Sequence, residues 1–83
     1  MELKQLRPTL SLSDLKKNET GQIVYSLAQG TLKHKLISMG FVPGIQIKMV
    51  RNAPLRDPIE IAIQNSLVTL RRTEAGLIVV EKL

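Results

Sequence analysis

The chain has 83 residues and a formal net charge of +5, from 12 Lys and Arg against 7 Asp and Glu. This length has room for one domain with one modest core, so we expect residues 1–83 to form a single domain whose first few residues fray. The absence of cysteine excludes disulfides and thiolate ligands for zinc or an iron–sulfur cluster. With one Tyr, one Phe and no Trp, the core must be almost wholly aliphatic.

The first expected elements lie between residues 10 and 27. Leucines alternate with Ser and Asp over residues 10–15, which predicts a short helical turn with Ser11 or Ser13 as its N-cap. Residues 17–21 have the composition of a turn. Residues 22–27 are rich in β-branched and aromatic side chains and predict the first strand, which Gly30 terminates.

A short helix follows, with Thr31 as its expected cap. Gly40 is placed to end this helix in the left-handed conformation, and Phe41 is then expected to fold back on Leu36. The helix has two faces, an apolar one with Leu32, Leu36 and Met39 and a polar one with Lys33, Lys35 and Ser38.

The second half of the chain predicts mainly strands. Apolar residues alternate with polar ones over residues 45–49 and again over 59–63, and a connection with two prolines separates these strands. Asn65 and Ser66 are expected to turn the chain into a strand over residues 67–70. Residues 71–75 have no clear assignment, and residues 77–80 form the last strand. Five short strands with one or two short helices predict a small, mainly β barrel that closes its own edges.

No constellation of catalytic residues is recognisable. The single histidine, His34, lies between two lysines and has no second His or Cys with which to share a metal ion. The carboxylates are scattered over different elements, and the glycines do not form a phosphate-binding loop. We therefore expect no enzyme, no cofactor and no metal site, although the sequence does not exclude direct iron binding.

The positive charge favours an acidic partner, which leaves nucleic acid, an anionic membrane surface or an acidic protein as alternatives. A small basic barrel that binds nucleic acid is the main alternative, with Arg71, Arg72, Lys33 and Lys35 as its phosphate contacts. Such barrels stack bases on aromatic side chains, and this chain has only two aromatics. No nucleic acid partner is therefore expected.

Leu55 is an unusual residue for a loop braced by prolines. Either it folds under the loop and plugs one end of the barrel, or the rigid loop presents it to a partner. The sequence leaves both interpretations open.

Three segments, residues 36–44, 53–61 and 70–75, carry the patterns L-x-x-x-G-x-x-P-G, A-P-L-x-D-P-I-E-I and L-R-x-x-E-A. In this order, and followed by residues 78–80, they resemble the FeoA family of ferrous iron transport proteins. The resemblance implies an SH3-like barrel in the bacterial cytoplasm that acts with FeoB, a permease with a GTP-binding domain, and performs no catalysis. It also implies transition-metal ion binding at the level of the family. Lys33, Lys35, Arg56 and Asn18 depart from the family pattern, which has arginines at the first two positions and glycines at the others.

These observations together predict a cytoplasmic accessory protein of ferrous iron uptake that works by binding a protein. The N-terminal residues lack the apolar stretch of a signal peptide, and no stretch approaches the roughly 20 apolar residues of a membrane span. We thus expect a protein that is peripheral to the membrane at most. Self-association is left open as an alternative. The predicted partner-binding residues are Lys33, His34, Lys35, Pro54, Leu55, Arg56 and Asp57.

Overall fold

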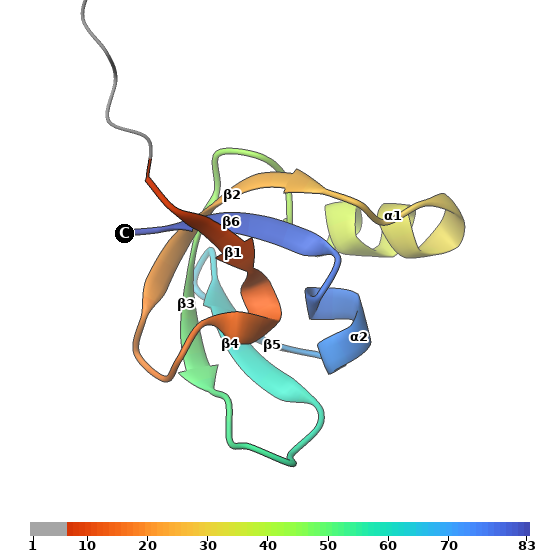
Figure 1. Ribbon diagram of the computed structural model, residues 1–83. Helices are drawn as coiled ribbons and strands as arrows, with labels where there is room; N and C mark the ends of the chain where they lie inside the picture. Colours follow the sequence, from red (N-terminus) through yellow and green to blue (C-terminus); the bar gives the residue numbers. More distant parts are fainter. Residues whose placement is uncertain (1–6) are drawn as a thin grey trace, which may run out of the picture.

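The computed structural model describes residues 7–83 (Figure 1). The expected fraying of the first residues falls on residues 1–6 and so lies outside the described part. The strands are β1 (Thr9–Ser11), β2 (Thr20–Ser26), β3 (Gln46–Arg51), β4 (Ile59–Ile63), β5 (Ser66–Leu70) and β6 (Ile78–Lys82). The helices are the 3₁₀ turn η1 (Leu12–Asp14), α1 (Gly30–Ser38) and α2 (Arg72–Ala75).

The strands form one antiparallel sheet in the order β1-β6-β2-β3-β4-β5. The expected mainly β fold with short helices is confirmed, and the sixth strand is β1. Three residues are too few to show an alternating pattern in the sequence. These residues form a strand because they pair with the edge of β6 that β2 leaves free, with Leu10 opposite Val80.

The two ends of the sheet, β1 and β5, do not pair with each other within residues 7–83, so the expectation that the small barrel closes its own edges is wrong. The Ser11 hydroxyl caps η1 by accepting a hydrogen bond from the Ser13 backbone at 3.2 Å, and this turn ends β1 after three residues. Helices η1 and α2 contact each other, and the Ser11 hydroxyl lies 3.4 Å from the Ala75 carbonyl oxygen. The helical turns therefore lie where further strand pairing would have closed the barrel.

The core is aliphatic, as predicted. The alternating isoleucines of β4 are all buried, as are alternate residues of β3. No polar or charged side chain within the described residues is buried. The buried residues are Leu12, Leu15, Ile23, Ala28, Leu36, Phe41, Ile47, Met49, Ile59, Ile61, Ile63, Leu70, Ala75, Ile78 and Val80.

The predicted end of α1 is confirmed, whereas its predicted start is wrong. Gly40 is left-handed at φ 100°, and the Phe41 backbone N–H donates to the Leu36 carbonyl at 3.0 Å. The helix begins at Gly30, so Thr31 is not its cap; Gln29 holds that position without a side-chain hydrogen bond. A glycine with φ 62° lets the chain enter the helix two residues earlier than Thr31 as a cap would imply.

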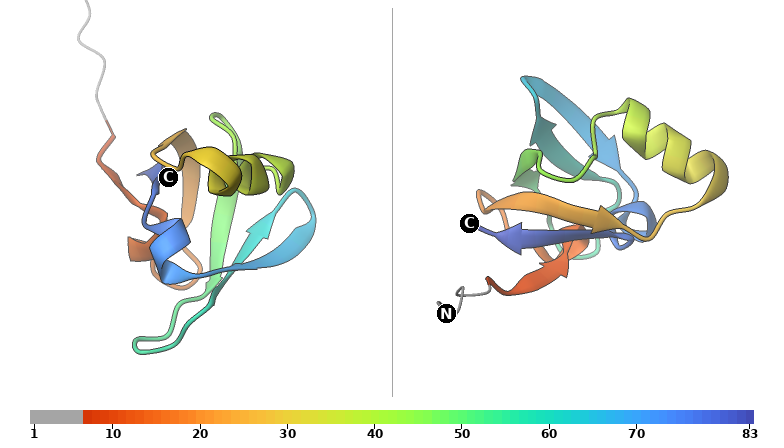
Figure 2. Two further views of the ribbon diagram at one scale, coloured as in Figure 1. Left: turned by 90° about the vertical axis from the view of Figure 1, so that its right-hand side faces the viewer. Right: turned by 90° about the horizontal axis from the view of Figure 1, so that it is seen from above.

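The turn between β4 and β5 also lies one residue earlier than predicted. Gln64 and Asn65, not Asn65 and Ser66, are its two central residues, and both have positive φ, as this kind of two-residue hairpin loop requires. Figure 2 shows α1 and the loop between β3 and β4 at opposite ends of the molecule in its left view. No helix within residues 7–83 is long and apolar enough to cross a membrane.

Candidate functional site

The first predicted binding element is the polar face of α1. Lys33, His34 and Lys35 are all exposed, while Leu36 anchors the helix in the core. Three consecutive residues span most of a helical turn, so these side chains leave the helix in different directions. Only Lys35 is directed at another element, because its ammonium forms an ion pair with Glu74 of α2 at 2.9 Å.

The second predicted element is the proline loop, residues 52–58, between β3 and β4. Leu55 lies at its tip with a relative exposure of 105%, so the interpretation of Leu55 as a plug for the barrel is wrong. Its φ of 65° is in the left-handed region, which costs a non-glycine residue roughly 1–2 kcal/mol. Leu55 thus contributes neither burial nor a favourable backbone conformation to folding.

Arg72 of α2 holds this loop in place. Its Nε donates to the Arg56 carbonyl at 2.8 Å and its Nη2 donates to the Ala53 carbonyl. Its backbone N–H donates at 2.9 Å to the carboxylate of Asp57, which therefore lies at the first residue of α2. Three hydrogen bonds from one arginine tie both sides of the loop to α2, and Leu55 projects between the two attachment points.

Glu74 connects the same short helix to α1. Its carboxylate accepts a hydrogen bond from the Lys35 ammonium and another, at 3.0 Å, from the Arg71 backbone N–H. The hydrogen bond from Lys35, followed by that from Arg71, lowers the pKa of Glu74 below its ordinary value, because both donors favour the charged form. The carboxylate thus stays ionised and keeps the ion pair to α1 near neutral pH.

Helix α2 therefore joins the two predicted elements, which the sequence treated as separate. Arg72 contacts the proline loop and Glu74 contacts α1. Neither was among the predicted partner-binding residues, and Arg72 was expected only as a phosphate contact in the nucleic-acid alternative. The spacing of Glu74 three residues after Arg71 is typical of a helix start, but Arg71 is not a usual capping residue, so the signal was weak. We call the exposed face of α1, α2 and the proline loop the composite surface.

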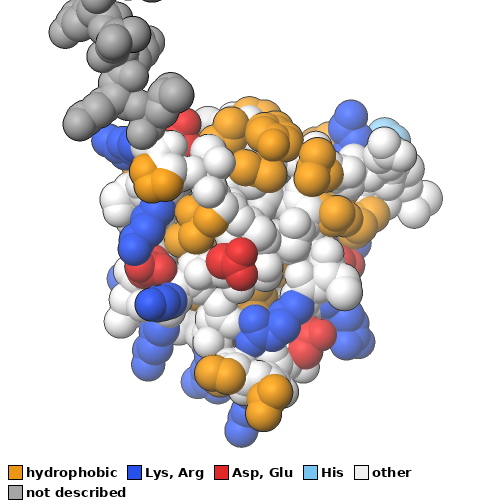
Figure 3. Space-filling view, in the orientation of Figure 1, with side chains coloured by type: hydrophobic (Ala, Val, Ile, Leu, Met, Phe, Trp, Pro, Cys, Tyr) orange, Lys and Arg blue, Asp and Glu red, His pale blue; other side chains and the backbone are white. Residues whose placement is uncertain are grey.

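The composite surface offers cations and an apolar tip and no reactive group. Within residues 7–83, no three His, Cys, Asp or Glu side chains are close enough together to hold a metal ion. In Figure 3, apolar side chains at the lower edge of the molecule lie next to Lys and Arg side chains. This mixture of charge and exposed apolar surface is suited to binding a macromolecule.

The fold defines the class of protein, which is a small, mainly β domain with short helices. The sequence profile of the FeoA domain matches residues 10–82. The chain therefore belongs to the FeoA family, which is associated with ferrous iron transport.

Known proteins of this family are similar to the chain in sequence and in fold. An Fe(2+) transport protein A/Fe(2+) transporter FeoB fusion protein of Porphyromonas gingivalis is 39% identical over 72 residues, which are 87% of this chain and 8% of that protein. The chain thus spans only a small part of that relative.

Two solved structures illustrate the likeness in fold. The solution structure of iron(II) transport protein A from Clostridium thermocellum has a TM-score of 0.84 and 44% identity, covering 89% of this chain and 46% of that one. FeoA of Stenotrophomonas maltophilia, crystallised with zinc and described as a procaryotic SH3 domain protein, has a TM-score of 0.78 and 25% identity, covering 87% of this chain and 89% of that one. The predicted SH3-like fold is confirmed.

Proposed function

We propose that this chain is a cytoplasmic accessory protein of ferrous iron uptake that binds a FeoB-type permease through the composite surface. The family supports the link to ferrous iron transport. The fusion of a related segment with the transporter FeoB in one polypeptide supports a direct association, because fused domains act side by side. The binding residues are Lys33, His34, Lys35, Pro54, Leu55, Arg56 and Asp57.

The observation that carries the proposal is the presentation of Leu55. Leu55 combines a fully exposed apolar side chain with a left-handed backbone, and both are unfavourable for an isolated domain. Arg72 nevertheless bonds the loop that carries it. Strained and exposed residues on a fixed support are typical of binding sites, where the partner supplies the burial that the free protein lacks. Leu55 is therefore the apolar anchor of the interface, and the cations around it select an acidic partner surface.

The test is capture of a purified, detergent-solubilised FeoB-type permease by the immobilised chain. Leu55→Asp is expected to abolish capture without lowering the melting temperature, because the side chain is exposed. Leu67→Asp is the matched control, since Leu67 is 60% exposed on β5 and lies outside the composite surface. Equal capture by wild type and Leu55→Asp, or a sharp loss of stability in Leu55→Asp, would contradict the proposal.

A further inference from the structure

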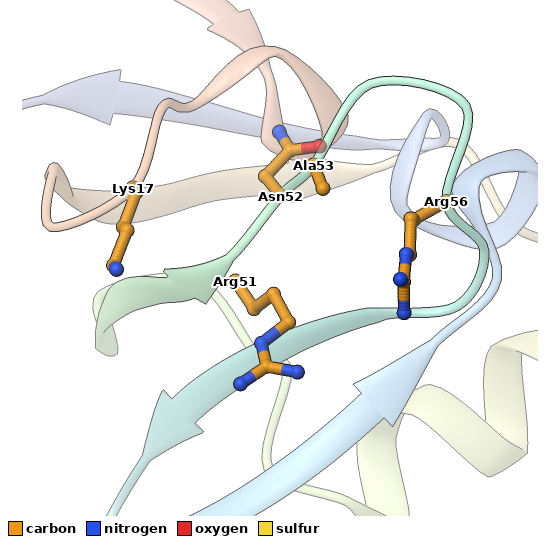
Figure 4. Close-up of a pocket in the computed structure, with 5 residues that line it drawn as sticks. All are labelled: Lys17, Arg51, Asn52, Ala53 and Arg56. Atoms are coloured by element: carbon orange, nitrogen blue, oxygen red, sulfur yellow. The ribbon is translucent and has the colours of Figure 1, made fainter.

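A basic pocket lies beside the proline loop, outside the residues predicted to bind the permease except for Arg56. It has a volume of about 370 Å³ and is lined by Lys17, Arg51, Asn52, Ala53 and Arg56. Figure 4 shows the side chains of Lys17, Arg51 and Arg56 extending from three different segments toward the same side of the opening. No local pattern groups these three cations, which are separated by up to 39 residues.

The segments that carry the cations are tied together by hydrogen bonds. The Asn52 amide donates to the carbonyls of Ser13 and Leu15, at 3.0 and 2.6 Å, and so links the end of β3 to the chain before Lys17. The Asn18 backbone N–H donates to the Met49 carbonyl at 2.7 Å. Together with the bonds from Arg72 to the loop, these contacts connect the segments that line the pocket.

Positive charge is in excess in this pocket. Within residues 7–83, Glu60 is the one carboxylate that forms an ion pair with any of the three cations, and it contacts Arg51 through Nε at 3.0 Å. The carboxylate of Glu19 pairs instead with Lys82, and that of Asp57 faces the backbone of Arg72. Like charges that the fold brings together repel each other, and an anion placed among them relieves that repulsion.

We infer that the basic pocket binds the phosphate group of an anionic phospholipid at the membrane surface. Phosphate presents several charged oxygens, which are the acceptors that guanidinium and ammonium groups prefer. The inference rests on the proposed function for the choice of a lipid, because a permease partner would bring this basic chain to a membrane whose inner leaflet is anionic. A soluble phosphate has the same chemistry, and the experiment distinguishes the two sources.

The test is flotation of the full chain with vesicles of phosphatidylglycerol and phosphatidylcholine in equal amounts, compared with phosphatidylcholine alone. We expect binding to the first vesicles only, and a weakening by salt. Lys17→Gln is expected to weaken binding about fivefold, the effect of one charge at such a surface. Lys33→Gln is the matched control, because it removes the same charge from α1, remote from the pocket; its effect is expected to stay below about twofold.

Three results would overturn the inference. They are flotation that does not depend on phosphatidylglycerol, equal weakening by Lys17→Gln and Lys33→Gln, and binding of glycerol phosphate in solution at Lys17 and Arg51 without vesicle binding. The last result would assign the pocket to a soluble phosphate. Capture of the permease in detergent is expected to survive Lys17→Gln and to weaken in Lys33→Gln, so failure of the lipid site and failure of the proposed function give opposite patterns.

Discussion

The guanidinium group of Arg72 connects α2 to the proline loop. Arg72→Ala removes the hydrogen bonds to the carbonyls of Ala53 and Arg56 and leaves the backbone bond to Asp57 intact. We expect the loop to remain attached at one side only. Leu55 would then lose its fixed position, although no residue of the core is changed.

The expected loss of stability follows from these two bonds. A hydrogen bond from a charged donor contributes about 1.5–3 kcal/mol when it is buried, and Arg72 is only partly buried, so about 1 kcal/mol for each bond is appropriate. The freed carbonyls lie in an exposed loop and are solvated by water, which adds no further penalty. Arg72→Ala should therefore lower the free energy of unfolding by about 1–2 kcal/mol, which corresponds to a fall in melting temperature of roughly 5–10 °C.

Urea unfolding and hydrogen exchange would test this expectation together. The Arg56 backbone N–H, which donates to Ala53 within the loop, should exchange faster in the variant. Arg72→Lys keeps the charge without the planar fork and should recover at most half of the loss. A change within about 0.5 kcal/mol, as for an ordinary surface substitution, or full recovery in Arg72→Lys, would refute the role given to the guanidinium group.

Three further substitutions test other features. Gly40→Ala should cost about 1–2 kcal/mol in urea unfolding, because φ is 100°; the new methyl would lie 2.9 Å from Gln64 Oε1, but that exposed side chain can rotate away. Gly44→Ala, with φ 93°, should cost about the same, and a loss below about 0.5 kcal/mol at both positions would contradict the role given to the left-handed backbone. Leu55→Asn should raise the free energy of unfolding by about 0.5 kcal/mol, because no burial is lost and Asn tolerates a left-handed backbone; a decrease in thermal melting would contradict this. Since the folded state lowers the pKa of Glu74 below 4.5, its contribution to stability is present above that pH and lost as the pH falls through the folded pKa. Glu74→Gln should weaken this acid dependence in urea titrations, and an unchanged dependence would speak against the ion pair.

Local sequence patterns predicted some features of the candidate site and missed others. The exposure of Lys33 and Lys35 was predictable, because the apolar residues of α1 define the opposite face. The proline loop was also recognised, but whether Leu55 lay inside or outside the barrel was not. Arg72, which fixes the loop, bonds residues 16 and 19 positions away, and no local pattern encodes such a contact.

The aliphatic core and the main strands could be read from local patterns, because the alternation in β3 and β4 and the Gly40-Phe41 helix end are local features. The other features depend on contacts between distant segments. Strand β1 forms because β6 offers an edge, α2 is too short to show a helical period, and the sheet stays open where the helical turns meet. The basic pocket exists for the same reason, since its cations come from segments that only the folded chain brings together.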